Sequence, residues 1–161
     1  MKHIVGQALL LMLGSSLGIA QPRAQQLNSA YFEVLGNTRL YSFNIDTVFP
    51  RNWGVRVGGA IDAIDFNTGR SDGEPIESAI FFSTVNYFIG ERPNLLELGV
   101  GPMFGYNRGS LWEFLELPAV TTTVGYRKQD ERGVVRVGFT PIWTRGKVFL
   151  SLGVSFGVGF R

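Results

Sequence analysis

The chain has 161 residues, of which 45% are hydrophobic and only 17% are charged, and it contains 21 glycines and 13 phenylalanines. This length corresponds to one domain. The absence of cysteine excludes a disulfide framework and a lipid-modified N-terminal cysteine. The net charge of +2 comes without a basic patch or a phosphate-binding loop, so the sequence predicts no nucleic-acid partner.

The N-terminal residues have the order of a secretory signal. Lys2 and His3 precede an apolar stretch that ends in small residues, and we place the cleavage site after Ala20. A retained membrane anchor is the alternative, but Gln7 and residues 14–16 interrupt the apolar run, which is shorter than the ~20 residues of a spanning helix. The predicted organisation is a signal peptide over 1–20, a short N-terminal segment over 21–28 and a barrel domain over 29–161.

From residue 29 onward, apolar residues alternate with small or polar ones, and no helical period is long enough to predict a helix. Successive side chains of a strand point to opposite faces, so each alternating run predicts a strand with two different faces. The predicted strands comprise residues 30–35, 39–48, 53–63, 79–89, 95–104, 118–127, 134–141 and 148–160.

The connections between these strands alternate in length. Residues 49–52, 90–94 and 128–133 are short and polar, whereas 64–78 and 105–117 are long. The remaining two connections, near Gly36-Asn37 and Thr144-Arg145-Gly146, are short as well. In an up-and-down barrel the three polar turns fall at one end and both long loops at the other, which is typical of outer-membrane barrels with short periplasmic turns and longer extracellular loops.

Within the last predicted strand, the stretch "FLSLGVSFGVGF" (149–160) has leucine, valine and phenylalanine at alternate positions from 150 onward, with glycine and serine between them. A soluble sandwich or ligand-carrying barrel carries Lys, Glu and Thr on its outward face instead. A face of small residues suits the interior of an eight-stranded barrel, which side chains just fill. We therefore predict that the apolar face contacts lipid.

Charged residues within the strands test this prediction, because an Arg or Lys that faces lipid at mid-depth costs about 2–4 kcal/mol. Four acidic and three basic residues share the inward parity, and this near balance predicts mutual pairing. The predicted interior charge network consists of Glu33, Asp46, Arg56, Asp62, Glu97, Arg127 and Arg136. A soluble sheet with a wetted polar face is the alternative, which the dominance of glycine on that face disfavours.

Aromatic residues near the strand ends form two groups, as expected at the two membrane–water interfaces. The predicted periplasmic group is Phe49, Trp53, Tyr87, Tyr126 and Phe160, and the opposite group is Tyr41, Phe81, Phe104, Phe139 and Trp143. Strand 79–89 leaves two registers open, because Ile80, Phe82 and Phe88 would face inward together with Thr84 and Asn86.

The signal peptide, the eight amphipathic strands and the aromatic end of the last strand resemble the small bacterial outer-membrane barrels related to the OmpA transmembrane domain and to OmpX. The segments "YFEVLGNTRLYSFNID", "LELGVGP", "GYR" and "RVGFTPIW" are similar to an uncharacterised group of predicted outer-membrane proteins over most of residues 29–156. The resemblance implies the fold and the compartment, but no ligand or reaction. It also implies recognition of the last strand by the outer-membrane assembly machinery, through Phe156 or Phe160.

Most catalytic chemistry is excluded. The single histidine, His3, leaves with the signal peptide, so neither a Ser-His-acid triad nor a histidine metal site is expected in the mature chain. Membrane-barrel acyltransferases and deacylases depend on a histidine, which disfavours that class. Three carboxylate pairs leave an aspartate-type hydrolase or a divalent cation site open, although loop carboxylates are more often simply solvated: Asp62 with Asp65, Glu74 with Glu77, and Glu113 with Glu116.

The two long loops are candidate contact surfaces. Residues 64–77 combine glycine, proline and net negative charge, which predicts a mobile surface loop. Residues 106–116 carry Leu111, Trp112, Phe114 and Leu115, which are too apolar for free solvent. These side chains either fold over the barrel rim, rest in the outer leaflet or meet a partner, so Trp112 and Phe114 are the candidate loop contacts.

We expect a monomeric, eight-stranded, antiparallel up-and-down transmembrane β-barrel of the outer membrane, acting without catalysis, cofactor or metal as an envelope scaffold or surface-interaction protein. The expected partners are outer-membrane lipid, the assembly machinery and an unidentified surface partner. A small pore or lipid-binding channel is the first alternative, since Arg56, Glu97 and Arg136 could line an ion path. A membrane-embedded enzyme and a secreted soluble barrel follow.

Overall fold

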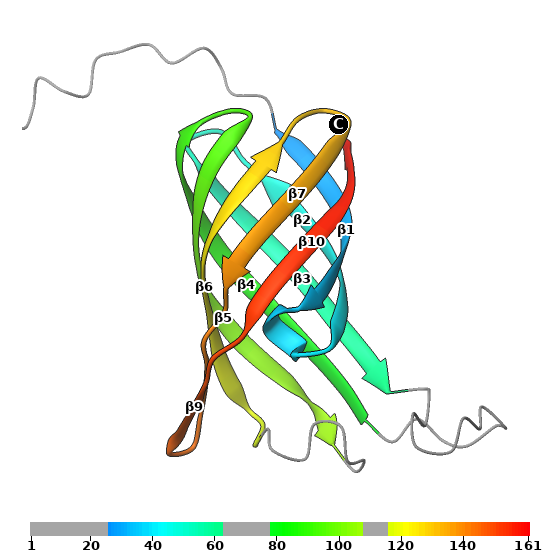
Figure 1. Ribbon diagram of the computed structural model, residues 1–161, viewed down its shortest axis with the longest axis vertical. Helices are drawn as coiled ribbons and strands as arrows, with labels where there is room; N and C mark the ends of the chain where they lie inside the picture. The colour runs from blue at the N-terminus through cyan, green and yellow to red at the C-terminus, as the bar shows by residue number, and fades with distance from the viewer. Residues whose placement is uncertain (1–25, 63–77, 108–115) are drawn as a thin grey trace, which may run out of the picture.

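The alternating segments form the strands of a closed barrel in the computed structural model of the chain (Figure 1). The structure describes residues 26–62, 78–107 and 116–161. Eight strands form the wall: β1 (Leu27–Leu35), β2 (Tyr41–Val48), β3 (Trp53–Asp62), β4 (Ser78–Glu91), β5 (Asn94–Asn107), β6 (Ala119–Gln129), β7 (Gly133–Phe139) and β10 (Leu152–Phe160). The other described elements are the 3-10 helix η2 (Gly36–Thr38) and a short hairpin of β8 (Ile142–Thr144) and β9 (Lys147–Phe149).

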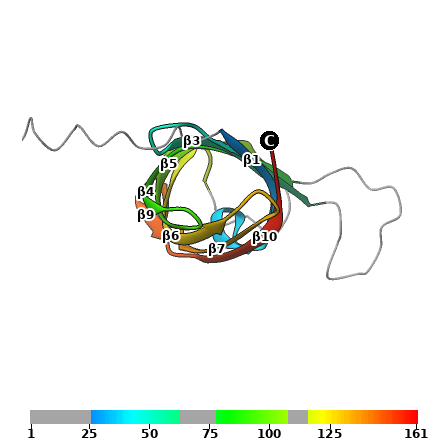
Figure 2. The same cartoon turned by 90° about the horizontal axis from the view of Figure 1, so that it is seen from above.

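Hydrogen bonding between neighbouring strands runs around the whole ring. The order β5-β4-β3-β2-β1-β10-β7-β6 is antiparallel throughout, and pairing of β5 with β6 closes it. At the β1–β10 seam, Asn28 lies opposite Phe160 and Leu35 opposite Gly153. Figure 2 shows the ring from one end. The predicted eight-stranded antiparallel barrel is therefore confirmed.

The two ends of the barrel differ as the loop lengths predicted. One end, the turn end, carries the short connections at residues 49–52, 92–93 and 130–132. The opposite end, the loop end, carries residues 36–40, the β8–β9 hairpin and the strand ends on either side of 63–77 and 108–115. The start of β1 and the C-terminus both lie at the turn end (Figure 1). The predicted signal peptide and its cleavage site fall in residues 1–25, outside the described residues.

The predicted strand 134–141 ends earlier than expected, and the predicted strand 148–160 is interrupted. Pro141 has no N–H to donate to a strand ladder, so β7 stops at Phe139 and the chain resumes as β8. Thr140 N–H bonds the Ser151 carbonyl at 2.7 Å, which bridges the break between β9 and β10. The β8–β9 hairpin then pairs with β6, where Val120 lies opposite Trp143.

Apolar side chains cover the outer face of the wall. Phe43, Ile45 and Leu152 are 66%, 62% and 63% exposed, although they sit in the middle or at the start of paired strands. Of the ten aromatic residues expected near the strand ends, all except the half-buried Tyr41 are exposed. At the turn end, the rings of Trp53 and Tyr87 contact each other with centroids 5.0 Å apart. An exterior of this kind is stable in hydrocarbon rather than in water.

Among the described residues, no helix has the length and hydropathy needed to cross a bilayer.

A charge on the outer face is predicted to destabilise the barrel in a depth-dependent way. Val100 is 53% exposed near the middle of β5, whereas Leu96 lies close to the turn end of the same strand. Val100→Arg should lower the free energy of unfolding in phospholipid vesicles by about 2–4 kcal/mol, and Leu96→Arg by about 0–1 kcal/mol. Urea titration of both variants measures the difference, and equal costs at the two positions would contradict lipid contact along the wall.

Candidate functional site: the charged interior of the barrel

The barrel interior is organised in three layers along its axis. A buried apolar cluster lies at the loop end: Ala60, Ile80, Phe82, Met103, Ala119 and Ile142. At the turn end a second apolar cluster is formed by Val48, Phe88 and Leu95. Buried polar and charged side chains lie between them. The charged middle thus lies between an apolar cluster at each end of the barrel.

Strand β4 contributes to all three layers and adopts the predicted register with inward apolar residues. Ile80 and Phe82 belong to the loop-end cluster, and Phe88 belongs to the turn-end cluster. Thr84 and Asn86, which lie between them, are 1% exposed and face the charged layer. The apolar residues that made this strand look irregular in the sequence belong to the apolar clusters at the two ends of the lumen.

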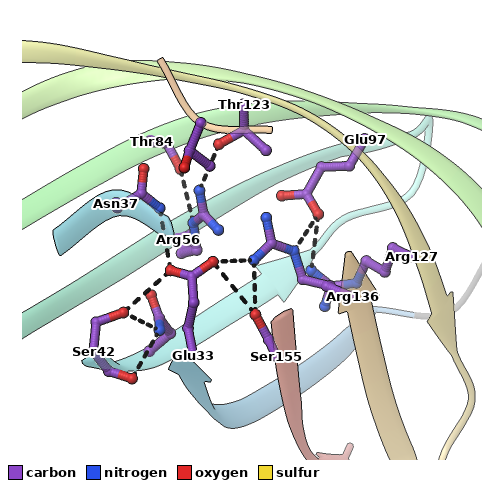
Figure 3. Close-up of polar contacts among 12 residues, drawn as sticks. Glu33, Asn37, Ser42, Arg56, Thr84, Glu97, Thr123, Arg127, Arg136 and Ser155 are labelled. Carbon is purple, nitrogen blue, oxygen red and sulfur yellow. Dashed lines mark hydrogen bonds and ion pairs between the residues drawn. The ribbon is translucent and has the colours of Figure 1, made fainter. Parts of the chain in front are cut away.

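Arg136 on β7 connects two carboxylates across the lumen (Figure 3). Its Nε donates to Glu97 Oε2 at 2.7 Å, and its Nη1 donates to Glu33 Oε1 at 3.0 Å. Nη1 also donates to Ser155 Oγ at 3.1 Å. Arg136 therefore ties β7 to β1, β5 and β10 by charge-assisted hydrogen bonds.

Arg127 on β6 forms the second centre of the network. It binds Asp46 through both Nη atoms, with Nη2 2.9 Å from Asp46 Oδ1. Its Nη2 also donates to Ser29 Oγ at 2.9 Å, and its Nε donates to Gln129 Oε1 at 2.8 Å. Glu97 Oε2 lies 3.8 Å from Arg127 Nη1, so Glu97 is shared between the two arginines.

Arg56 on β3 is held differently. It is fully buried, and its Nε and Nη2 donate to the hydroxyls of Thr84 at 3.3 Å and Thr123 at 3.0 Å. Its guanidinium lies 5.5 Å from the centroid of the Phe82 ring, within the range of a cation–π contact. No carboxylate of the described residues lies within ion-pair distance of it, and its Nη1 has no hydrogen-bond partner there.

The connection 36–40, predicted as a plain turn, folds into the lumen as η2 (Figure 2). Asn37 is fully buried, donates to Glu33 Oε2 at 3.4 Å and accepts a hydrogen bond from Thr121 Oγ1 at 2.6 Å. Gly36 has φ +70°, and a Cβ there would meet the carboxylate of Glu33. The signal in the sequence that could have indicated this fold is Gly36, because glycine tolerates the positive φ found there.

Glycines on the inner face leave room for these polar side chains. A Cβ at Gly58 would collide with the amide oxygen of Asn44 and lie 2.5 Å from Phe82 Cζ. A Cβ at Gly99 would collide with the amide oxygen of Asn86. The face of small residues in the sequence therefore provides the space that large inward side chains of neighbouring strands occupy.

The structure places six of the seven predicted network residues inside the barrel, each at most 3% exposed: Glu33, Asp46, Arg56, Glu97, Arg127 and Arg136. The side chain of Asp62 lies outside the described residues, as do Trp112 and Phe114. Phe156 and Phe160 lie on the outer face, 57% and 45% exposed. Sequence analysis missed Asn37, Thr121 and Ser155 as members of the network.

Several buried polar atoms of the charged layer have no hydrogen-bond partner among the described residues. They include Arg56 Nη1, Glu97 Oε1, Arg136 Nη2 and both side-chain polar atoms of Asn86. Within the same residues, no group of three His, Cys, Asp or Glu side chains is placed to hold a metal ion. Of the three predicted carboxylate pairs, only the side chain of Glu116 is described; it lies at the loop end, 3.8 Å from Lys147 Nζ.

No family model and no curated protein sequence matches this chain. Among solved structures, the chain is similar to the Yersinia pestis outer membrane protein Ail, solved in a phospholipid bilayer nanodisc. The TM-score is 0.51 at 11% sequence identity, and the match covers 84% of this chain and 98% of Ail. The chain therefore has the fold of an eight-stranded transmembrane β-barrel of the outer-membrane kind.

Removal of the shared carboxylate should strongly destabilise the barrel. Glu97→Gln leaves Arg136 and Arg127 with reduced compensation in a buried layer, so we expect a loss of about 3–5 kcal/mol in the free energy of unfolding. The double variant Glu97→Gln/Arg136→Gln should lose less than the sum of the two single variants. Glu91→Gln, at an exposed site of β4, is the control and should stay within about 0.5 kcal/mol of wild type. Additive losses would contradict direct coupling.

Replacement of an inner glycine by alanine is predicted to destabilise the barrel at one position and not at another. A Cβ at Gly157 would collide with the Ala30 carbonyl and lie 2.5 Å from Tyr31 Cα, whereas at Gly138 its nearest neighbours are 3.6 Å away. Gly157→Ala should therefore cost about 1–3 kcal/mol by overpacking. Gly138→Ala should be neutral or stabilising by up to about 1 kcal/mol, because alanine restricts the unfolded chain. Denaturant titration of both variants tests this, and equal effects would contradict the described packing.

Proposed function

We propose that this chain is a non-catalytic integral protein of the outer membrane, an envelope scaffold or surface-interaction protein whose closed, charge-paired interior stabilises the wall. The observation that carries the proposal is the layered interior: ion pairs in the middle, and apolar clusters around Phe82 and Phe88 at the two ends. An aqueous pore requires a continuous polar path, and these clusters interrupt it at both ends.

The proposed location rests on two independent features. The exterior is apolar along the strands and carries aromatic residues toward both ends, as expected of a wall in a bilayer. The fold is similar to that of Ail, an outer membrane protein. With the predicted signal peptide over 1–20, these features favour export and insertion as a monomer, assisted by the assembly machinery through the β10 strand with Phe156 and Phe160.

A scaffold whose interior is closed interacts through its surface. The strand ends that flank 63–77 and 108–115 lie at the loop end, and the second of these two segments contains Trp112 and Phe114. We propose these two residues as the contact with lipid or with a partner at the cell surface. A pull-down with the two loops, with Trp112→Ala as the matched control, tests this assignment.

A small pore is the second candidate, and one observation favours it. Arg56 Nη1, Glu97 Oε1 and Arg136 Nη2 have no partner among the described side chains, so the charged layer offers polar atoms to an ion. The apolar clusters at both ends oppose this reading, because an ion that crosses them loses its hydration.

Conductance separates the two candidates. In planar bilayers, the wild-type protein should give no discrete current steps, because both apolar seals block hydrated ions. Heat-modifiable migration on a gel confirms that the sample is a folded barrel, and a soluble secreted protein would lack it. Discrete steps in wild type that vanish in Arg56→Ala would overturn the scaffold and favour the pore.

A further inference from the structure

The outer face of the barrel has a groove of about 610 Å³ at the turn end, bordered by β6, β7 and β10. Its walls combine the apolar side chains of Val135, Phe156 and Val158 with the charged side chains of Lys128 and Arg132. In the strand register, Lys128 lies opposite Val135, and Val135 lies opposite Phe156. The groove therefore joins an apolar floor to a basic rim.

A glycine produces this hollow. Gly133 begins β7 at a position of the same parity as the exposed Val135 and Val137, so the outer face lacks a side chain there. Its neighbour across the ladder is Val158, which in turn lies opposite the small Ala30. A Cβ added at Gly133 would have only the Gly157 carbonyl oxygen nearby, at 3.4 Å, so the hollow can be filled without strain.

The charges at the groove favour an anion. Lys128 and Arg132 are exposed and make no ion pair among the described residues, and Glu131 is paired with Arg161. Asp130, the one acidic lining residue, uses Oδ1 to accept the backbone N–H groups of Arg132 at 2.8 Å and Gly133 at 2.9 Å. These hydrogen bonds hold the pKa of Asp130 below its usual range, so it stays ionised and bound to its own turn.

The depth of the groove corresponds to the headgroup region. Lys128 lies just beyond Tyr126 on the same outer face, toward the turn end, and Tyr126 belongs to the aromatic group at that interface. A basic side chain at this level meets lipid phosphates, while the exposed side chains of Phe156 and Val158 on β10 supply the apolar part of the groove.

We propose that this groove binds one anionic phospholipid of the leaflet at the turn end, with its phosphate between Lys128 and Arg132 and an acyl chain along Phe156 and Val158. The lining carries two positive charges, on Lys128 and Arg132, against the single negative charge of Asp130, so it selects an anionic headgroup over a zwitterionic one. The inference goes beyond the proposed scaffold function and requires only that the barrel is inserted in a bilayer.

The test compares lipid association in nanodiscs of phosphatidylcholine that contain a minor fraction of phosphatidylglycerol. Native mass spectrometry of the released barrel measures how much of each lipid stays bound. One basic side chain near a membrane surface contributes about fivefold to the association of anionic lipid. Lys128→Gln/Arg132→Gln should therefore lower phosphatidylglycerol retention about 25-fold relative to wild type, with phosphatidylcholine retention unchanged.

Two further variants make the test specific. Arg145→Gln/Lys147→Gln removes the same charge at the loop end, where both side chains are exposed, and should leave retention unchanged. Gly133→Leu keeps every charge but fills the hollow, and it should reduce retention at least fivefold. Heat-modifiable migration confirms folding of each variant. Equal retention of both lipids by wild type, equal losses in the two double variants, or full retention in Gly133→Leu would each overturn the proposal.

Discussion

The pairing of charges within a narrow lumen is the constraint on which the rest of this barrel depends. An eight-stranded wall encloses only enough space for side chains, so each inward charged group must find its partners inside. For Arg127 and Arg136 these include carboxylates, and for Arg56 they are the hydroxyls of Thr84 and Thr123. Glu97 meets this constraint by serving both Arg127 and Arg136, while Asp46 and Glu33 complete the two clusters. These contacts join β1, β2, β5, β6 and β7 across the axis, perpendicular to the hydrogen bonds of the wall. The interior contacts therefore stabilise a sheet whose apolar exterior lies in lipid and is not stabilised by removal from water.

Small residues on the inner face make this arrangement sterically feasible. Gly58 and Gly99 lie where Asn44 and Asn86 project, and Gly36 lies beneath the carboxylate of Glu33. A barrel interior with uniform mid-sized side chains would have no room for guanidinium groups. Glycine is usually unfavourable in strands, and here the cost is offset by the volume that it leaves to arginine and asparagine on neighbouring strands.

The sequence predicted the features that follow from a period of two. Alternation in β3, β5 and β10 assigned each side chain to a face, and the loop lengths assigned the two ends. It could not predict which charges pair, because the partners Arg136 and Glu33 are distant in sequence and their contact depends on the shear of the closed sheet. The interruption at Pro141 and the inward fold of η2 were also missed, since both depend on local backbone geometry within a segment that otherwise alternates.

Strand β4 illustrates how tertiary context completes an ambiguous pattern. Its inward Ile80 and Phe88 contradict a simple rule that the lumen is polar, yet each belongs to an apolar layer that closes one end. A rule based on faces alone treats all inward positions as equivalent. In the structure, the inward positions differ by their depth along the barrel axis. Those near either end pack in the apolar clusters, and those at mid-height face the arginines.

The seam between β1 and β10 also determines the order in which the wall can be completed. Residues 28 and 160 are partners in the strand register. During synthesis, β1 can therefore form hydrogen bonds along this second edge only after almost the whole chain has been made. Until then both β1 and β7 have an edge of unpaired backbone groups. In hydrocarbon these groups would lack hydrogen bonds, and next to another copy they would pair with its open edge. Contacts between such distant segments are slow to form. Protection of these two open edges is thus a physical requirement of biogenesis for this topology.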